Sequence, residues 1–152
     1  MNLRKTLSKE TILLDLKKSA KEGIIEEMID FLTGAGKIRE KKDALKAVID
    51  RERKMSTGMQ NGIAIPHGKT DMVDTLIAAV ALKKSGADFG SLDGQPSKIF
   101  VMTLSPDTRT GPHIQFLAEI SRQLNDPAVR EKILNATKPE DVLDALSGPV
   151  GG

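Results

Sequence analysis

Apolar residues in the first third of the chain recur three or four positions apart, which is the spacing of one face of a helix. The pattern covers residues 20–32 and 41–53 and predicts an amphipathic helix over each range. Ser19 and Glu22 have the spacing of a capping box, in which each side chain bonds the backbone N–H of the other residue. They predict where the first helix begins, and Gly34 predicts its end.

The last third of the chain predicts three more helices. Residues 110–124 carry an apolar stripe at helical spacing. An Asp-Pro pair opens the range 126–133, where the aspartate predicts an N-cap and the proline suits the first helical position. Thr137 and Glu140 have the spacing of a second capping box and predict a final helix that begins beside them.

The middle of the chain is dominated by apolar runs without helical spacing, which predict buried strands. The segment between the two longest runs contains Gly86, Gly90 and Gly94 and no helical pattern, so we expect a hairpin there rather than a crossover helix. A polar stretch over residues 56–62 predicts a loop. The expected strands are residues 11–16, the segment that leads to His67, 76–82 and 99–104.

These elements predict an α/β fold: a single-domain sandwich with a central mixed β-sheet flanked by helices on both faces. A length of 152 residues fits one domain. We expect that domain to span residues 1–148 and residues 149–152 to be a disordered tail.

Composition excludes several classes of function. The chain has no cysteine, which excludes disulfides, thiolate nucleophiles and cysteine-based zinc sites. Its net charge of +2 is spread without a basic tract, and it has four Phe but no Tyr or Trp, so we expect no nucleic-acid partner. No apolar run reaches the roughly 18 residues of a membrane span, and the N-terminus lacks the apolar core of a signal peptide. We therefore expect a cytoplasmic protein that is not embedded in a membrane.

One of the two histidines, His67, follows an apolar stretch and Pro66, and Gly68 comes after it. Proline fixes its own φ, and a glycine leaves room for a close ligand. The pattern predicts an imidazole presented at the end of a buried strand, a position suited to chemistry.

The second histidine, His113, lies beside Pro112 at the expected start of a helix, where unpaired N–H groups favour an anion. Arg51 closes the second helix. A neutral nitrogen of His67 is able to attack phosphorus, and Arg51 suits the phosphoryl oxygens. The residues alone predict a histidine site for an anion.

Each of these residues also has a plain structural interpretation. His67 and His113 fit ordinary core or surface positions, and Arg51 fits a solvated helix end. A metal site built on the two histidines needs further ligands, and no spacing in the sequence indicates them.

The run Asn61-Gly62-Ile63-Ala64-Ile65-Pro66-His67-Gly68 closely resembles the active-site signature of a known family. The family is that of the EIIA domains of the bacterial phosphoenolpyruvate-dependent sugar phosphotransferase system, in the mannitol–fructose class with its nitrogen-regulatory branch. The similarity extends over nearly the whole chain. Three further segments resemble the family in the right order: residues 50–54, 89–96 and 113–117.

The resemblance implies a phosphocarrier, a protein-histidine phosphotransferase component without metal or other cofactor. His67 is implied as the phosphorylated nucleophile through Nε2, His113 as the neighbour that stabilises the phosphoryl group, and Arg51 as the charge partner. The implied donor is the phosphocarrier HPr or its nitrogen-branch relative. In the sugar branch, the implied acceptor is a cysteine of an EIIB domain. In the regulatory branch, the phosphorylation state is implied to act as a signal to a target protein.

Some features leave alternatives open. A free-standing single domain favours the nitrogen-type EIIA, although fructose-type EIIA proteins also occur alone. A non-catalytic anion- or protein-binding regulatory module is the alternative from another class. Gln60 stands where the signature has a small residue and puts partner docking in question. Met55, Met59 and Ile65 suit either a docking surface or the core.

Overall fold

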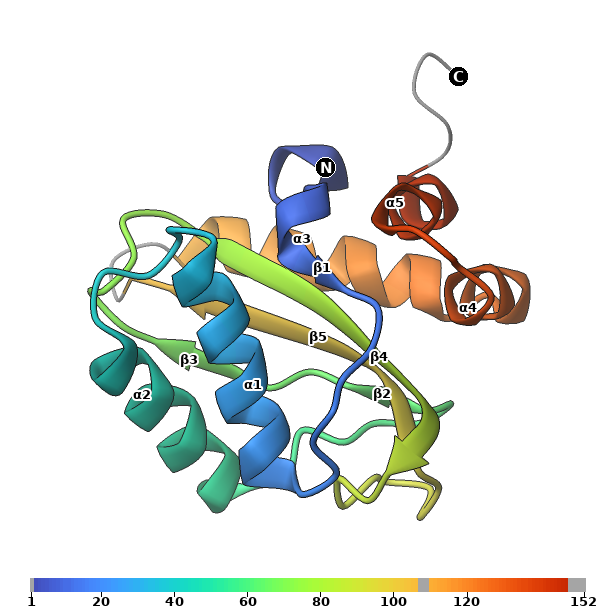
Figure 1. Cartoon of the computed structure of the whole chain (residues 1–152), viewed down its shortest axis with the longest axis horizontal. Coiled ribbons are helices and arrows are strands. Elements are labelled where there is room, and N and C mark those ends of the chain that lie inside the picture. Colours follow the sequence, from blue (N-terminus) through green and yellow to red (C-terminus); the bar gives the residue numbers. More distant parts are fainter. Residues whose placement is uncertain (1, 107–109, 148–152) are drawn as a thin grey trace.

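The long antiparallel pair β4 (Ile77–Ala87) and β5 (Ser97–Ser105) forms the centre of the sheet. A computed structural model of the chain describes residues 2–106 and 110–147, and within them the sheet has five strands (Figure 1). β1 (Ile12–Leu13) runs parallel to β4 at one edge. β2 (Ile63–Ala64) and β3 (His67–Lys69) both run parallel to β5 at the other edge. The sheet is therefore mixed, as expected.

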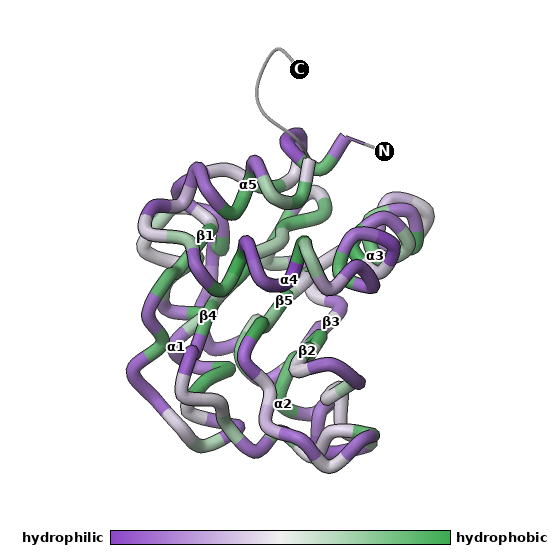
Figure 2. Tube along the Cα trace, turned by 90° about the vertical axis from the view of Figure 1, so that its right-hand side faces the viewer, coloured by the Kyte–Doolittle hydropathy of each residue, from purple (hydrophilic) through white to green (hydrophobic). Residues whose placement is uncertain are grey.

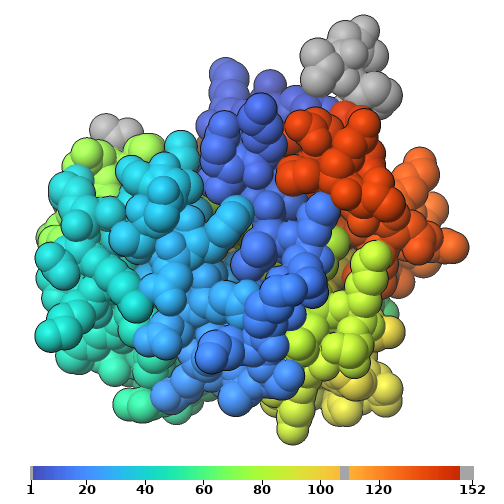
Figure 3. Space-filling model, viewed as in Figure 1, coloured from blue at the N-terminus to red at the C-terminus, as the bar shows by residue number. Residues whose placement is uncertain are grey.

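Helices cover both faces of this sheet, which confirms the predicted α/β sandwich. One face carries α1 (Lys21–Gly34) and α2 (Lys41–Lys54), which cover the left and centre of the face seen in Figure 3. The other face carries α3 (Thr110–Leu124), α4 (Pro127–Leu134) and α5 (Pro139–Ser147). Two short 3-10 helices, Leu3–Lys5 and Lys9–Thr11, precede β1.

Alternation along β4 and β5 divides the core into two layers, because successive strand residues point to opposite faces. The tube is apolar along much of both strands, whereas the helices change between apolar and polar residues along their length (Figure 2). The layer under α3, α4 and α5 receives Ala78, Val80, Leu82, Ile99 and Val101. The layer under α1 and α2 receives Ala79, Ala81, Phe100, Met102 and Leu104.

The predicted helices are confirmed, but two of their predicted caps are wrong. Ala20, not Ser19, precedes α1 and makes no side-chain cap. Instead, the Glu27 carboxylate accepts hydrogen bonds from the backbone N–H groups of Lys17 and Lys18. These bonds hold the segment before α1 against the side of the helix. Before α5, the backbone N–H of Thr137 donates to Asp141 rather than to Glu140 (3.0 Å). Asp126 does cap α4, by accepting from the N–H of Ala128.

The hairpin between β4 and β5 is confirmed, whereas two other strands differ from their predictions. The expected strand over residues 11–16 pairs only through Ile12–Leu13. The strand that leads to His67 breaks at Pro66, which has no N–H for a ladder, and pairing resumes at His67. His67 therefore begins a strand instead of ending one.

The predicted tail, residues 149–152, lies outside the described residues. Within residues 2–106 and 110–147, no helix is long and apolar enough to cross a membrane.

Gly68 is required by packing against α2. A Cβ atom at this position would lie 3.0 Å from the backbone N of Val48 and 3.1 Å from the backbone C of Ala47. These are helix backbone atoms, which cannot move aside independently. The glycine after His67 therefore lets α2 rest directly on β3.

We expect Gly68→Ala to lower the free energy of unfolding by about 1–3 kcal/mol, the usual cost of inserting a methyl group into a packed contact. Gly34→Ala is the matched control, because nothing lies within 4 Å of its added Cβ. Urea unfolding of both variants checks the prediction. A Gly68→Ala variant as stable as Gly34→Ala would show that α2 does not press on β3.

Candidate active site

The His67 ring is anchored by its own chain. His67 is half-buried at the start of β3, and its Nδ1 lies 2.9 Å from the carbonyl oxygen of Ile65. A carbonyl oxygen only accepts hydrogen bonds, so Nδ1 carries the hydrogen. In the neutral ring Nε2 then has a free lone pair. The backbone thus determines which ring nitrogen of His67 keeps a free lone pair.

His113 lies beside His67, but it comes from helix α3, which covers the sheet, whereas His67 comes from the sheet itself. The buried stripe of α3 contains Phe116, Ile120 and Leu124, and His113 continues this stripe toward the helix N-terminus. The two ring centroids are 5.7 Å apart, with the ring planes inclined at 53°. The structure therefore brings together the two histidines that the sequence predicts as partners.

Thr103 on β5 joins the two histidines and is a residue that the sequence reasoning missed. It is the register partner of His67, and its Oγ1 lies 2.8 Å from Nε2 of His113. Its side chain is fully buried. One signal in the sequence could have indicated it: Thr103 is the single hydroxyl residue inside the apolar run over residues 99–104. A buried hydroxyl without a hydrogen bond is costly, so a partner for it was to be expected.

The surroundings of His113 favour its neutral form. Burial lowers the pKa of His113 below its usual value of 6.5, and the neighbouring basic side chains of His67 and Lys69 lower it further. The resting site therefore pairs a His67 with a free Nε2 lone pair and a neighbouring neutral imidazole.

Arg51 closes α2 as predicted, but it does not contact the imidazoles. Its Nη1 donates to the carbonyl oxygen of Met55 at 2.8 Å. The hydrogen bonds and ion pairs of the described residues include none between Arg51 and either histidine. The guanidinium is thus held at the helix end, where it secures the first residue of the following loop.

A buried carboxylate fixes the loop that leads to the site. Glu52 is 6% exposed and accepts from the backbone N–H of Thr57 at 2.8 Å and from its hydroxyl at 2.5 Å. The ammonium of Lys21 on α1 neutralises the carboxylate at 2.9 Å. Because a buried charge is tolerated only when it is paired and hydrogen-bonded, this cluster defines the path of the loop.

Ser56 ties the same loop to the turn after β4. Its hydroxyl donates to the Phe89 carbonyl at 2.5 Å and accepts from the N–H of Gly58 at 3.1 Å. The Lys21 ammonium lies 4.8 Å from the centroid of the Phe89 ring. Segments 50–54 and 89–96, which resemble the EIIA family in the sequence, therefore meet beside the loop that precedes His67.

Apolar side chains surround the loop. Met55 is 70% and Met59 41% exposed, so the interpretation of these two residues as core is wrong. Ile65 is partly buried and packs against the core. Gln60 and Ile65 help to line a hollow of about 330 Å³ between this loop and α3. Gln60 is exposed at the edge of this hollow, and its effect on the docking of a partner stays a prediction.

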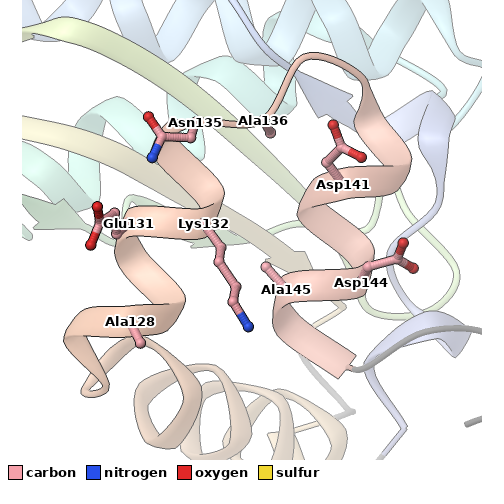
Figure 4. Close-up of a pocket in the computed structure, with 8 residues that line it drawn as sticks. All are labelled: Ala128, Glu131, Lys132, Asn135, Ala136, Asp141, Asp144 and Ala145. Atoms are coloured by element: carbon pink, nitrogen blue, oxygen red, sulfur yellow. The ribbon is translucent and has the colours of Figure 1, made fainter.

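A larger hollow of about 620 Å³ lies between α4 and α5 and contains neither histidine (Figure 4). Two of its three acidic side chains already have partners: Asp141 accepts from Thr137, and Asp144 pairs with Arg4 at 2.7 Å. In the described part of the chain, no group of three or more His, Cys, Asp or Glu residues is placed to hold a metal ion. The histidine pair therefore remains the candidate site.

Solved structures define the class of domain. The crystal structure of the nitrogen regulatory protein IIA-Ntr from Neisseria meningitidis matches with a TM-score of 0.87 and 26% identity, over 95% of this chain and 98% of that one. The mannitol EIIA of Escherichia coli, solved in complex with phosphorylated mannitol EIIB, matches with a TM-score of 0.79 and 26% identity, over 95% and 99%. The fold is that of an EIIA domain.

The chain belongs to the family of the phosphoenolpyruvate-dependent sugar phosphotransferase system, EIIA 2, whose model matches residues 5–148. The fructose-specific EIIA component of Haloferax volcanii is 38% identical over 91% of this chain and 90% of its own length. The fructose-specific EIIABC component of Bacillus subtilis is 33% identical over 97% of this chain, which spans only 23% of that protein. The chain is therefore a component of a phosphotransferase system.

The lowered pKa of His113 predicts how stability depends on pH. The folded protein holds the His113 proton more weakly than the unfolded chain does, so stability is complete above pH 6.5 and falls as the pH drops below it. We expect the free energy of unfolding of His113→Gln to fall less steeply below pH 6.5 than that of the wild type. Urea unfolding of both proteins across this range measures it, and parallel curves for wild type and variant would contradict the assignment.

Proposed function

We propose that the chain is a cytoplasmic phosphoryl carrier that accepts a phosphoryl group on Nε2 of His67. The donor is the phosphohistidine of HPr or of its nitrogen-branch relative. The observation that carries the proposal is the hydrogen bond from Nδ1 of His67 to the Ile65 carbonyl, because it leaves Nε2 as the nucleophile.

The transfer needs positioning and little else. The lone pair of Nε2 forms the new bond to phosphorus as the P–N bond of the donor breaks, and the donor imidazole keeps the electron pair. The phosphorylated His67 ring retains its Nδ1 hydrogen. The Ile65 carbonyl accepts that hydrogen before and after transfer, so the bond also stabilises the product.

His113 is the neighbour that stabilises the transferred group. An imidazole 5.7 Å away, centroid to centroid, is within reach of oxygens bound to the phosphorus on His67. The negative charge of a phosphoryl group raises the pKa of a neighbouring imidazole. His113 thus takes up a proton when the group arrives and, as a cation, donates a stronger hydrogen bond. It releases this proton again when the group leaves.

Arg51 supplies positive charge from the end of α2. Its bond to the Met55 carbonyl is to a neutral group, so a phosphoryl anion competes well for the guanidinium. Exposed Met55 lies at the same point, where a docked partner would cover it. Arg51 is therefore assigned to the docked complex rather than to the resting site.

The phosphoryl group then passes to a cysteine of an EIIB domain, or its presence serves as a regulatory signal. The EIIB acceptor is supported by the solved complex of mannitol EIIA with phosphorylated EIIB and by the fusion of EIIA with EIIB in the Bacillus relative. The regulatory outcome is supported by the fit to the Neisseria protein. The comparisons lend no support to a binding module without phosphotransfer.

Incubation with phosphoenolpyruvate, enzyme I and HPr tests the proposal. We expect the mass of the wild type to rise by one acid-labile phosphoryl group and His67→Ala to remain unmodified. Ser105→Ala is the control, because Ser105 lies on the neighbouring strand β5 and its hydroxyl has no hydrogen-bond partner in the described part of the chain. A His67→Ala protein that still gains the group would refute the choice of nucleophile, and an unmodified wild type would refute the function.

A second stage separates the two outcomes. The phosphorylated wild type is offered a panel of EIIB domains, and loss of its phosphoryl group is followed by mass. Efficient discharge to one EIIB would establish the sugar branch. Phosphoprotein that no EIIB discharges would favour the regulatory branch.

A further inference from the structure

We infer that Thr103 is a positioning residue that fixes which nitrogen of His113 carries the proton. The inference rests on the proposed function for its consequence, but not for its structural part. The geometry is a hydroxyl–imidazole pair, with Oγ1 of Thr103 2.8 Å from Nε2 of His113. Distance alone leaves the donor open, because either atom is able to carry the shared hydrogen.

Burial decides the direction of this hydrogen bond. The Thr103 side chain is fully buried, and His113 is the one hydrogen-bond partner that the described residues give its hydroxyl. If Nε2 donated, the hydroxyl hydrogen would have no acceptor, which is costly in the interior. If the hydroxyl donates, both groups are satisfied. Thr103 therefore donates to Nε2, and the neutral His113 ring carries its hydrogen on Nδ1.

The sheet register makes this arrangement specific to the site. Thr103 is the Cα partner of His67 on the neighbouring parallel strand, so both side chains stand on the face that α3 covers. The residue that neighbours the nucleophile thus also orients the imidazole that faces it. A second proton on His113 adds at Nε2, and the hydroxyl then rotates to accept it.

Ser105 provides a contrast on the same strand face. It lies two residues after Thr103, its side chain is buried, and among the described residues its Oγ has no hydrogen-bond partner. Burial of a hydroxyl on this face therefore does not by itself produce a bond to His113. Ser105→Ala is the matched control for removing a buried hydroxyl without affecting the imidazole.

The test is nitrogen NMR of protein labelled with ¹⁵N in its histidines. The chain has two histidines, so His67→Ala assigns the spectrum. We expect neutral His113 to carry its hydrogen on Nδ1 in the wild type, in Thr103→Ser and in Ser105→Ala. In Thr103→Val, which keeps the shape but lacks the hydroxyl, we expect the Nε2–H form to appear.

Phosphoryl transfer from phospho-HPr supplies the second readout. We expect transfer to be about tenfold slower in Thr103→Val, the effect of losing one buried hydrogen bond in the transition state. Transfer should be restored in Thr103→Ser and be unchanged in Ser105→Ala.

A wild type with Nε2–H on neutral His113 would overturn the inference, and so would a Thr103→Val variant that keeps the wild-type tautomer or transfer rate. If Thr103→Val does not fold, the tautomer of the wild type and of Thr103→Ser still decides. A wild type that accepts no phosphoryl group refutes the proposed function but leaves the tautomer measurable.

Discussion

The hydrogen bond from the His67 ring to the Ile65 carbonyl is the constraint on which the site depends, and a chain of hydrogen bonds holds it in place. The Thr57 carbonyl accepts the N–H of Ile65 at 3.0 Å, and Glu52 accepts the N–H and the hydroxyl of Thr57. The buried carboxylate of Glu52 therefore fixes the position of Thr57, and Thr57 fixes that of Ile65, although Glu52 lies in the helix before the loop.

The break at Pro66 is what allows this arrangement. β2 pairs with β5 through Ala64, and β3 pairs with it from His67, so the Ile65 carbonyl is free of the ladder. The two faces of β3 then contact different helices. His67 turns toward α3 and His113, whereas Gly68 lies against the backbone of α2. The nucleophile is thus held between a helix that fixes its strand and a helix that carries its partner.

The sequence was sufficient to predict the elements with a strong local signal. The spacing of apolar residues predicts α1, α2 and α3, and the glycines between the two long strands predict their hairpin. The two histidines were identified from their settings beside Pro66 and Pro112 and from the resemblance to the EIIA family, and the structure places them side by side.

Contacts between remote segments were not predictable in the same way. The bond from Thr103 to His113 depends on how α3 crosses β5, and the tie from Glu27 to residues 17–18 depends on the turn before α1. Arg51 shows the same limit, since its local position was right but its partner is the Met55 carbonyl. Spacing along the chain indicates a face of an element, whereas a partner depends on tertiary packing.

The central claim is that the backbone selects Nε2 of His67, and the most direct test locates the phosphorus on the ring. In phosphorylated protein labelled with ¹⁵N in its histidines, coupling between ³¹P and ¹⁵N identifies the bonded nitrogen. The account predicts phosphorus on Nε2 of His67 with the hydrogen retained on Nδ1. Phosphorus on Nδ1 would contradict it, because the Ile65 carbonyl would then face a nitrogen without a hydrogen.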